Sequence, residues 1–142
     1  MIFTDTHTHL YSEEFESDQA EMIQRAIENG VQKLFVPSID SSYTEKMYDL
    51  KNKYPENVHL MMGLHPCSVK PETYLDELAF VERELEKHKF AAIGEIGLDY
   101  YWIKDNKEKQ QEVFIKQLEL ALKYNKPVVI HSREATNDTY KI

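Results

Sequence analysis

Short apolar segments rich in β-branched residues alternate along this chain with longer amphipathic segments, and no other feature restricts its fold as strongly. The apolar segments recur about every 30 residues, at 2–6, 33–36, 58–62, 90–93 and 127–130. Short, nearly continuous apolar strands are typical of parallel sheets that are covered on both faces, and helices connect such strands. The alternation therefore predicts an α/β fold with five parallel strands.

The segments between these strands show the periodicity of amphipathic helices. The predicted helices cover residues 18–29, 42–54, 75–85 and 113–122, and a further helical pattern begins at about Asn137. Asp18 and Glu21 resemble a capping box at the start of the first helix, and Gly30 suits its carboxyl-terminal cap. The chain is thus expected to be a series of β/α units.

Two arrangements of such units fit a chain of 142 residues. A doubly wound sheet of the flavodoxin type fills about this length. A closed, eight-stranded β/α barrel of the TIM type takes about 250 residues, so the chain would supply about five of its eight units. The last helical pattern reaches Ile142 before a covering helix is complete, which favours a truncated barrel. No linker or internal repeat interrupts the sequence, so residues 1–142 are expected to form one domain.

The composition limits the function and the location. A formal net charge of −8 gives the molecule no general attraction to nucleic acid or to anionic membranes, so an anionic substrate must be held locally. No segment approaches the roughly 18 apolar residues that cross a bilayer, and the chain starts without a basic leader. The single cysteine, Cys67, suits a reducing compartment. We expect a cytoplasmic protein without membrane association, and nothing in the sequence indicates a stable protein partner.

Two histidines follow the first predicted strand in the sequence His7-Thr8-His9. Residues i and i+2 of a strand project from the same face about 6 to 7 Å apart, so the two imidazoles can share one metal ion. Asp5 has the same parity and is a candidate to orient a ligand histidine. Two ordinary polar strand residues would give the same pattern, so the pair alone does not establish a site.

Glu95 and His131 also follow apolar strand segments. Glu95 lies among apolar residues and glycines, where an unpaired buried carboxylate is costly and a metal cation would remove that cost. Each residue also has a structural explanation, because Glu95 can turn to solvent or pair with a basic residue, and a lone histidine at a strand end is commonly structural. The carboxyl ends of parallel strands are, however, where α/β enzymes build their sites. We therefore predict one metal site, formed by His7, His9, Glu95 and His131.

Three imidazoles and one carboxylate make a mixed nitrogen and oxygen donor set. Zn²⁺ prefers such a set, and Mn²⁺, Fe²⁺, Co²⁺ and Ni²⁺ tolerate it, whereas Ca²⁺ and Mg²⁺ favour oxygen ligands. We expect one or two divalent metal ions, and Zn, Mn, Mg, Fe, Co and Ni all remain candidates.

Four ordered segments resemble successive motifs of the TatD family of metal-dependent deoxyribonucleases. They are Asp5-Thr6-His7-Thr8-His9-Leu10, Gly63-Leu64-His65-Pro66, Ala92-Ile93-Gly94-Glu95-Ile96-Gly97-Leu98-Asp99-Tyr100 and Pro127-Val128-Val129-Ile130-His131-Ser132-Arg133. The resemblance extends over essentially the whole chain and includes the glutamine-rich segment 110–114. It implies a barrel of the amidohydrolase type with metal-dependent cleavage of DNA phosphodiester bonds.

The resemblance also implies roles for individual residues. His7 and His9 match the ligands of one metal ion, and His131 matches a ligand of another. Glu95 matches a carboxylate that both ions share. His65 matches a histidine beside the site, where it would act catalytically by donating to a phosphate oxygen or to the leaving group. The family pattern continues to a further histidine ligand and a metal-binding aspartate, which are absent here, so the chain by itself is expected to be inactive.

The implied nucleophile is a water molecule activated by the metal ions. An acidic surface disfavours binding of long DNA tracts and favours attack at exposed, single-stranded ends. Tyr100, Tyr101 and Trp102 either stack on a base or pack within their loop. Two other functions stay open, namely a metallohydrolase that cleaves an amide or ester bond and an inactive fragment or pseudoenzyme.

Overall fold

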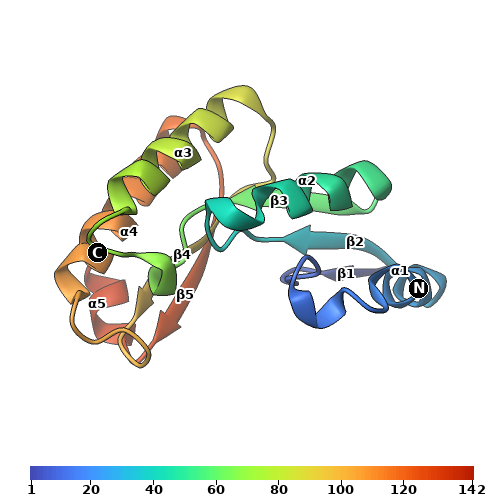
Figure 1. The fold of residues 1–142 in the computed structure, drawn as a ribbon, viewed down its shortest axis with the longest axis horizontal. Helices are drawn as coiled ribbons and strands as arrows, with labels where there is room; N and C mark the ends of the chain where they lie inside the picture. Colours follow the sequence, from blue (N-terminus) through green and yellow to red (C-terminus); the bar gives the residue numbers. More distant parts are fainter.

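Five parallel strands form one sheet in the computed structural model, which describes residues 1–142 (Figure 1). The strands are β1 (Phe3–Asp5), β2 (Val31–Val36), β3 (Val58–Met62), β4 (Ala92–Asp99) and β5 (Val128–Arg133). They lie in the order β1-β2-β3-β4-β5, and every neighbouring pair is parallel. The five predicted strands are confirmed, although β4 and β5 extend further toward their carboxyl ends than predicted.

The strand order decides between the two predicted arrangements. A doubly wound sheet reverses its strand order at a switch point, whereas a β/α barrel adds each strand beside the previous one. The sequential order observed here excludes the flavodoxin-type alternative. The sheet also curls, and β4 and β5 run in a clearly different direction from β1 and β2 in Figure 1. The chain therefore forms about half of a TIM-type barrel, as predicted.

Five helices pack on the sheet. They are α1 (Gln19–Glu28), α2 (Thr44–Lys53), α3 (Tyr74–Lys87), α4 (Lys107–Lys123) and α5 (Thr136–Lys141), and short 3₁₀ turns at Glu13–Phe15, Ser41–Tyr43 and Pro66–Ser68 follow the first three strands. The predicted helices are confirmed, but the capping box is not formed, because the Asp18 side chain makes no hydrogen bond at the start of α1. No helix is both long and apolar enough to cross a membrane.

The core lies between the sheet and the apolar faces of the helices. One continuous cluster contains Ile23 of α1, Met47 and Leu50 of α2, Val81 of α3, Phe114 of α4, and the strand residues Val36, Leu60, Ile93 and Ile96. Each fully buried side chain of this size contributes about 1.5–3 kcal/mol relative to an exposed one. The strands that carry the candidate site are thus held on a packed base. By contrast, three apolar residues of the outer strands are exposed, namely Phe3 of β1, Ile130 of β5 and Ile2 beside β1. Strands β1 and β5 lie at the two ends of the sheet, and each has one unpaired edge.

Strand β4 continues past the predicted residues because glycine lets its backbone approach β5 very closely. All eight residues of β4 are buried. Gly97 has a φ of +134°, and a Cβ added to it would lie 2.0 Å from the carbonyl oxygen of His131. Glu95 and His131 consequently lie within β4 and β5, rather than after them as the apolar segments predict.

Candidate metal centre

Five side chains from four separate strand ends meet at one point of the half-barrel. His7 and His9 lie just after β1, His65 lies just after β3, and Glu95 and His131 lie in β4 and β5. All four predicted metal ligands are therefore brought together, with His65 beside them. The carboxyl ends of the strands form this edge of the sheet, where sites of β/α barrels are built.

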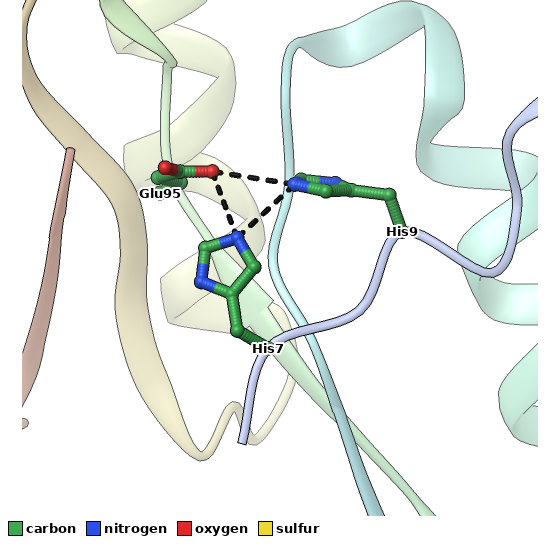
Figure 2. A group of neighbouring side chains, drawn as sticks. All are labelled: His7, His9 and Glu95. Atoms are coloured by element: carbon green, nitrogen blue, oxygen red, sulfur yellow. Dashed lines mark hydrogen bonds and ion pairs between the residues drawn. The ribbon is translucent and has the colours of Figure 1, made fainter. Parts of the chain in front are cut away.

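The first donor group contains His7, His9 and Glu95 (Figure 2). The Oε2 atom of Glu95 lies 3.1 Å from Nε2 of His7 and 3.3 Å from Nε2 of His9. The two Nε2 atoms are 3.2 Å apart. Figure 2 shows both rings turned toward the carboxylate from the segment that follows β1. Both rings face the carboxylate as the i, i+2 spacing predicts, although β1 itself ends at Asp5.

The second donor group contains His65, Glu95 and His131. The other carboxylate oxygen, Oε1 of Glu95, lies 3.1 Å from Nδ1 of His131 and 3.8 Å from Nε2 of His65. These two ring nitrogens are 3.2 Å apart. Each oxygen of Glu95 therefore faces a different pair of imidazoles, which is the arrangement of a carboxylate placed between two cation positions.

The hydroxyl of Tyr11 determines which nitrogen of His9 carries a proton. This hydroxyl donates to the carbonyl oxygen of Pro37 at 2.6 Å and lies 2.7 Å from Nδ1 of His9. A tyrosine has one hydroxyl proton, so Tyr11 must accept the second hydrogen bond from His9 Nδ1–H. The lone pair of His9 is then on Nε2, the atom that faces Glu95.

A buried carboxylate determines the proton position of His131 in the same way. Asp99 has no exposed surface, and its Oδ2 lies 2.8 Å from Nε2 of His131. An ionised carboxylate only accepts hydrogen bonds, and this contact is shorter than the 3.1 Å contact of Nδ1 with Glu95, so in the neutral ring Nε2 carries the proton and Nδ1 carries the lone pair. This carboxylate–histidine pairing is typical of histidines that bind metal ions.

These proton positions provide a test of whether the residues fit a metal ion. The lone pairs of His9 and His131 face the carboxylate of Glu95, so acceptor faces acceptor at about hydrogen-bond distance, although Nδ1 of His131 also lies 3.2 Å from Nε2 of His65. A cation between the donor atoms, or additional protons on the rings, stabilises such contacts. In each group the donor atoms lie within 4.8 Å of one another. A divalent ion that accepts nitrogen and oxygen ligands fits this arrangement.

His65 differs from the other histidines in its hydrogen bonding. Its Nδ1 accepts a hydrogen bond from the backbone N–H of Cys67 at 3.1 Å. A neutral imidazole with an accepting Nδ1 carries its proton on Nε2, so His65 presents an N–H donor to the site. His65 therefore matches a donor better than a ligand, even though its position alone would allow either role.

The charges of the site follow from burial and from these contacts. Burial alone would raise the pKa of Glu95, but its contacts with His131 and His9, which become hydrogen bonds when these rings are protonated, outweigh burial and hold this pKa far below its usual range. The hydrogen bond that a protonated His131 makes with Glu95 raises the pKa of His131 despite its burial. Burial lowers the pKa of His65 to about 4, so this imidazole is neutral at pH 7. The site thus combines a fixed negative charge with a neutral donor.

Asp5 does not act as the sequence predicts. Its Oδ1 accepts a hydrogen bond from the backbone N–H of His7 at 3.1 Å, and it holds the backbone rather than a ring. The residues that orient rings are instead Tyr11 and Asp99, which the sequence reasoning does not single out. Asp99 lies in the motif at residues 92–100, but only its contact with His131 of β5 shows that it orients a ring.

Two buried glutamines of α4 hold the strand ends that carry the site. Gln110 accepts from the backbone N–H of Asp99 at 2.8 Å and donates to its carbonyl oxygen at 2.9 Å. Gln117 forms the same pair of bonds with Leu64, at 2.7 and 3.1 Å. The two glutamines are seven residues apart and so share one face of the helix. That spacing is the sequence signal that could have identified them.

The chain matches known proteins over nearly its full length. The family model described as TatD related DNase matches residues 4–142. The chain is 38% identical to the uncharacterized metal-dependent hydrolase YabD of Bacillus subtilis (strain 168), over 100% of this chain and 54% of that protein. It is 34% identical to the putative deoxyribonuclease tatdn3 of Danio rerio, over 96% of this chain and 55% of that protein.

Solved structures show the same fold. The crystal structure of YjjV, a TatD homologue from Escherichia coli K12, superposes with a TM-score of 0.84 at 32% identity, over 98% of this chain and 54% of that one. An uncharacterized amidohydrolase from Saccharomyces cerevisiae gives a TM-score of 0.83 at 21% identity, over 99% of this chain and 51% of that one, and supports the fold alone.

The half-barrel matches solved TatD-family structures, and its cluster of histidines and one carboxylate could hold a metal ion. The chain belongs to the TatD related DNase family. It spans about half the length of the curated relatives that it matches.

Proposed function

We propose that this chain supplies the metal-binding half-barrel of a TatD-family hydrolase that cleaves DNA phosphodiester bonds. The observation that carries the proposal is the position of Glu95, whose two carboxylate oxygens each face a different pair of imidazoles. His7 and His9 would hold one divalent ion, His131 would hold another, and Glu95 would contact both. When bound, such ions polarise phosphate oxygens and lower the pKa of water to near neutral.

The remaining roles fall to residues of the chain. Tyr11 and Asp99 keep the lone pairs of His9 and His131 directed at the ion positions. His65 offers its Nε2–H to a phosphate oxygen or to the leaving oxygen, because Cys67 occupies its other nitrogen. A preorganised donor of this kind stabilises the charge that develops on oxygen during phosphoryl transfer.

DNA as the substrate is supported by the family description and by the name of the relative from Danio rerio. The net charge of −8 disfavours extended contact with a duplex, so we propose exposed single-stranded ends as the point of attack. A reducing, cytoplasmic location remains part of the proposal, on the basis of the single free cysteine.

The test is nucleotide release from single-stranded DNA with added Mg²⁺, Mn²⁺ or Zn²⁺, compared with a chelated sample. Chelator-sensitive release that disappears in Glu95→Gln is the expected result for a version of the protein that also carries the remaining strands of the barrel, whereas residues 1–142 alone are expected to release little. The matched control is Glu119→Gln on the outer face of α4, which removes the same charge far from the cluster and should leave release unchanged. Release that survives Glu95→Gln would overturn the shared-carboxylate role.

Two other functions are outcomes of the same experiment. Hydrolysis of small amides or aminoacyl esters without release of nucleotides would indicate an amide or ester hydrolase. No turnover on any substrate by either version, with metal still bound, would indicate an inactive protein.

A further inference from the structure

An arginine and two aromatic rings gather beside the candidate metal centre. The guanidinium carbon of Arg133 lies 4.1 Å from the centroid of the Tyr101 ring and 5.3 Å from that of Trp102. The two rings meet edge to face, with centroids 4.7 Å apart and an interplanar angle of 87°. We call Tyr101, Trp102 and Arg133 the aromatic platform.

The platform is exposed, unlike the aromatic residue next to it. Trp102 is 64% exposed and Tyr101 is 40% exposed, whereas Tyr100 is 7% exposed and donates its hydroxyl to Asp138. Tyr100 therefore packs within its loop, which was one of the alternatives for all three aromatic residues. Packing does not explain the large exposed surface of the other two rings.

Arg133 is a cation without an anionic partner. None of the ion pairs of the protein includes it, although acidic residues outnumber basic ones by 25 to 17. Its guanidinium is held by the faces of two rings instead, which leaves its N–H groups directed at no protein acceptor. An arginine held in this way is suited to bind phosphate, because its planar donors match phosphate oxygens.

One carboxylate connects the platform to the metal centre. Oδ1 of Asp99 accepts from the backbone N–H groups of Tyr101 at 3.0 Å and Trp102 at 2.8 Å. Its Oδ2 faces the ring of His131, and Arg133 follows two residues later in β5. The platform and the candidate ligand are thus fixed by the same buried side chain.

We propose that the aromatic platform binds the nucleotide next to the scissile phosphate of single-stranded DNA, with its base stacked on Trp102 and its phosphate paired with Arg133. This inference rests on the proposed function, because it assumes a nucleic acid at the metal centre. Bases in single-stranded segments stack on aromatic side chains irrespective of sequence, and arginine adds charge and further stacking. A duplex end would have to unpair before a base could reach Trp102.

Trp102 is the only tryptophan of the chain, so its fluorescence reports on the platform directly. The experiment titrates the protein with a short oligothymidylate at low salt and in the presence of a chelator, so that binding is measured without cleavage. Saturable quenching of the tryptophan emission is expected. A self-complementary hairpin of the same length should quench it less, because its bases are paired.

Variants separate the two contacts, with binding measured by the anisotropy of a labelled oligonucleotide. Trp102→Ala should weaken binding about five- to 150-fold, the range for one stacked base, and Trp102→Phe should restore most of it. Arg133→Gln should make the slope of log affinity against log salt shallower by about 0.7, the value for one phosphate on a single strand. Leu122→Ala and Lys53→Gln, which change an exposed apolar residue and an exposed cation elsewhere, should bind as the unchanged protein does.

The outcomes distinguish this inference from the proposed function. If single-stranded DNA is hydrolysed while Trp102 emission stays constant and Trp102→Ala binds normally, the proposed role of the aromatic platform is wrong. The proposed nuclease function is then retained. If the emission is quenched but no added metal gives hydrolysis, the aromatic platform binds single-stranded DNA and the proposed nuclease function is wrong. If an RNA oligonucleotide quenched the emission equally and bound more tightly than the DNA oligonucleotide, DNA would be excluded as the occupant of the platform.

Discussion

Replacement of Asp99 by Asn should reverse the proton positions of His131 while changing almost no atoms. Oδ1 of Asp99 accepts from two backbone N–H groups, those of Tyr101 and Trp102, and Oδ2 faces Nε2 of His131. An asparagine has one oxygen and one NH₂ group to place in these two positions. The outcome depends on which position the oxygen takes.

The structure favours one orientation strongly. If the NH₂ group faced Tyr101 and Trp102, two partly buried backbone donors would lose their acceptor, at about 1–3 kcal/mol each. The oxygen should therefore stay with the backbone, and the NH₂ group should face His131. Nε2 of His131 must then accept, so the ring proton moves to Nδ1 and occupies the lone pair that faces Glu95. Loss of such an outer partner weakens metal binding by about tenfold to a hundredfold, or about 1.4–2.7 kcal/mol.

The assay has two readouts. Competition with a chromophoric chelator measures the affinity for Zn²⁺, and ¹⁵N spectra of the histidine rings report which nitrogen of His131 carries the proton. Asp138→Asn is the matched control, because Asp138 is a partly buried aspartate that loses the same charge but hydrogen-bonds Tyr100 and Gln111 rather than a histidine ring. It should change neither readout.

An Asp99→Asn variant that binds Zn²⁺ as tightly as the unchanged protein would refute the proposed role of Asp99 in orienting His131. A ring proton that remains on Nε2 of His131 would refute it equally. Weaker binding in the Asp138→Asn control would show that net charge, rather than proton position, controls the affinity.

Four further substitutions test the orientation of His9, the shared carboxylate and the packing of the strand ends. Tyr11→Phe removes the acceptor that orients a histidine and should weaken Zn²⁺ binding about tenfold in the same competition assay; unchanged affinity would contradict the hydrogen-bond assignment. Glu95→Gln should lower the amount of metal bound per chain, measured by elemental analysis after dialysis, and full stoichiometry would show that the carboxylate is not shared. Gly97→Ala should destabilise the fold by about 3 kcal/mol or more in urea unfolding, because the added Cβ meets the carbonyl oxygen of His131; a loss below about 1 kcal/mol would mean that β4 and β5 separate easily. Gln117→Ala should cost about 2–5 kcal/mol by the same method, since two buried backbone groups lose their partner, and a neutral effect would imply that other groups replace it.

The local sequence determines the elements and most of the candidate ligands. Apolar segments of strand length and helices with one apolar face are properties of neighbouring residues, so the five strands and the helices could be predicted directly. The i, i+2 spacing of His7 and His9 likewise predicted that both rings point the same way, although both residues lie past the end of β1. The extent of β4 could not be predicted, because Glu95 and two glycines interrupt its apolar pattern, and only the close approach of β5 explains why the strand continues.

Tertiary structure alone decided how these parts act together. The order of the strands separates a half-barrel from a doubly wound sheet, and both arrangements are compatible with the same local pattern. The proton positions of His9 and His131 depend on Tyr11 and Asp99, and the carboxylate of Asp99 meets its histidine across 32 residues of sequence. A hydrogen bond between residues so far apart exists only after the sheet has formed, because its direction is a property of the packed strands and not of either segment.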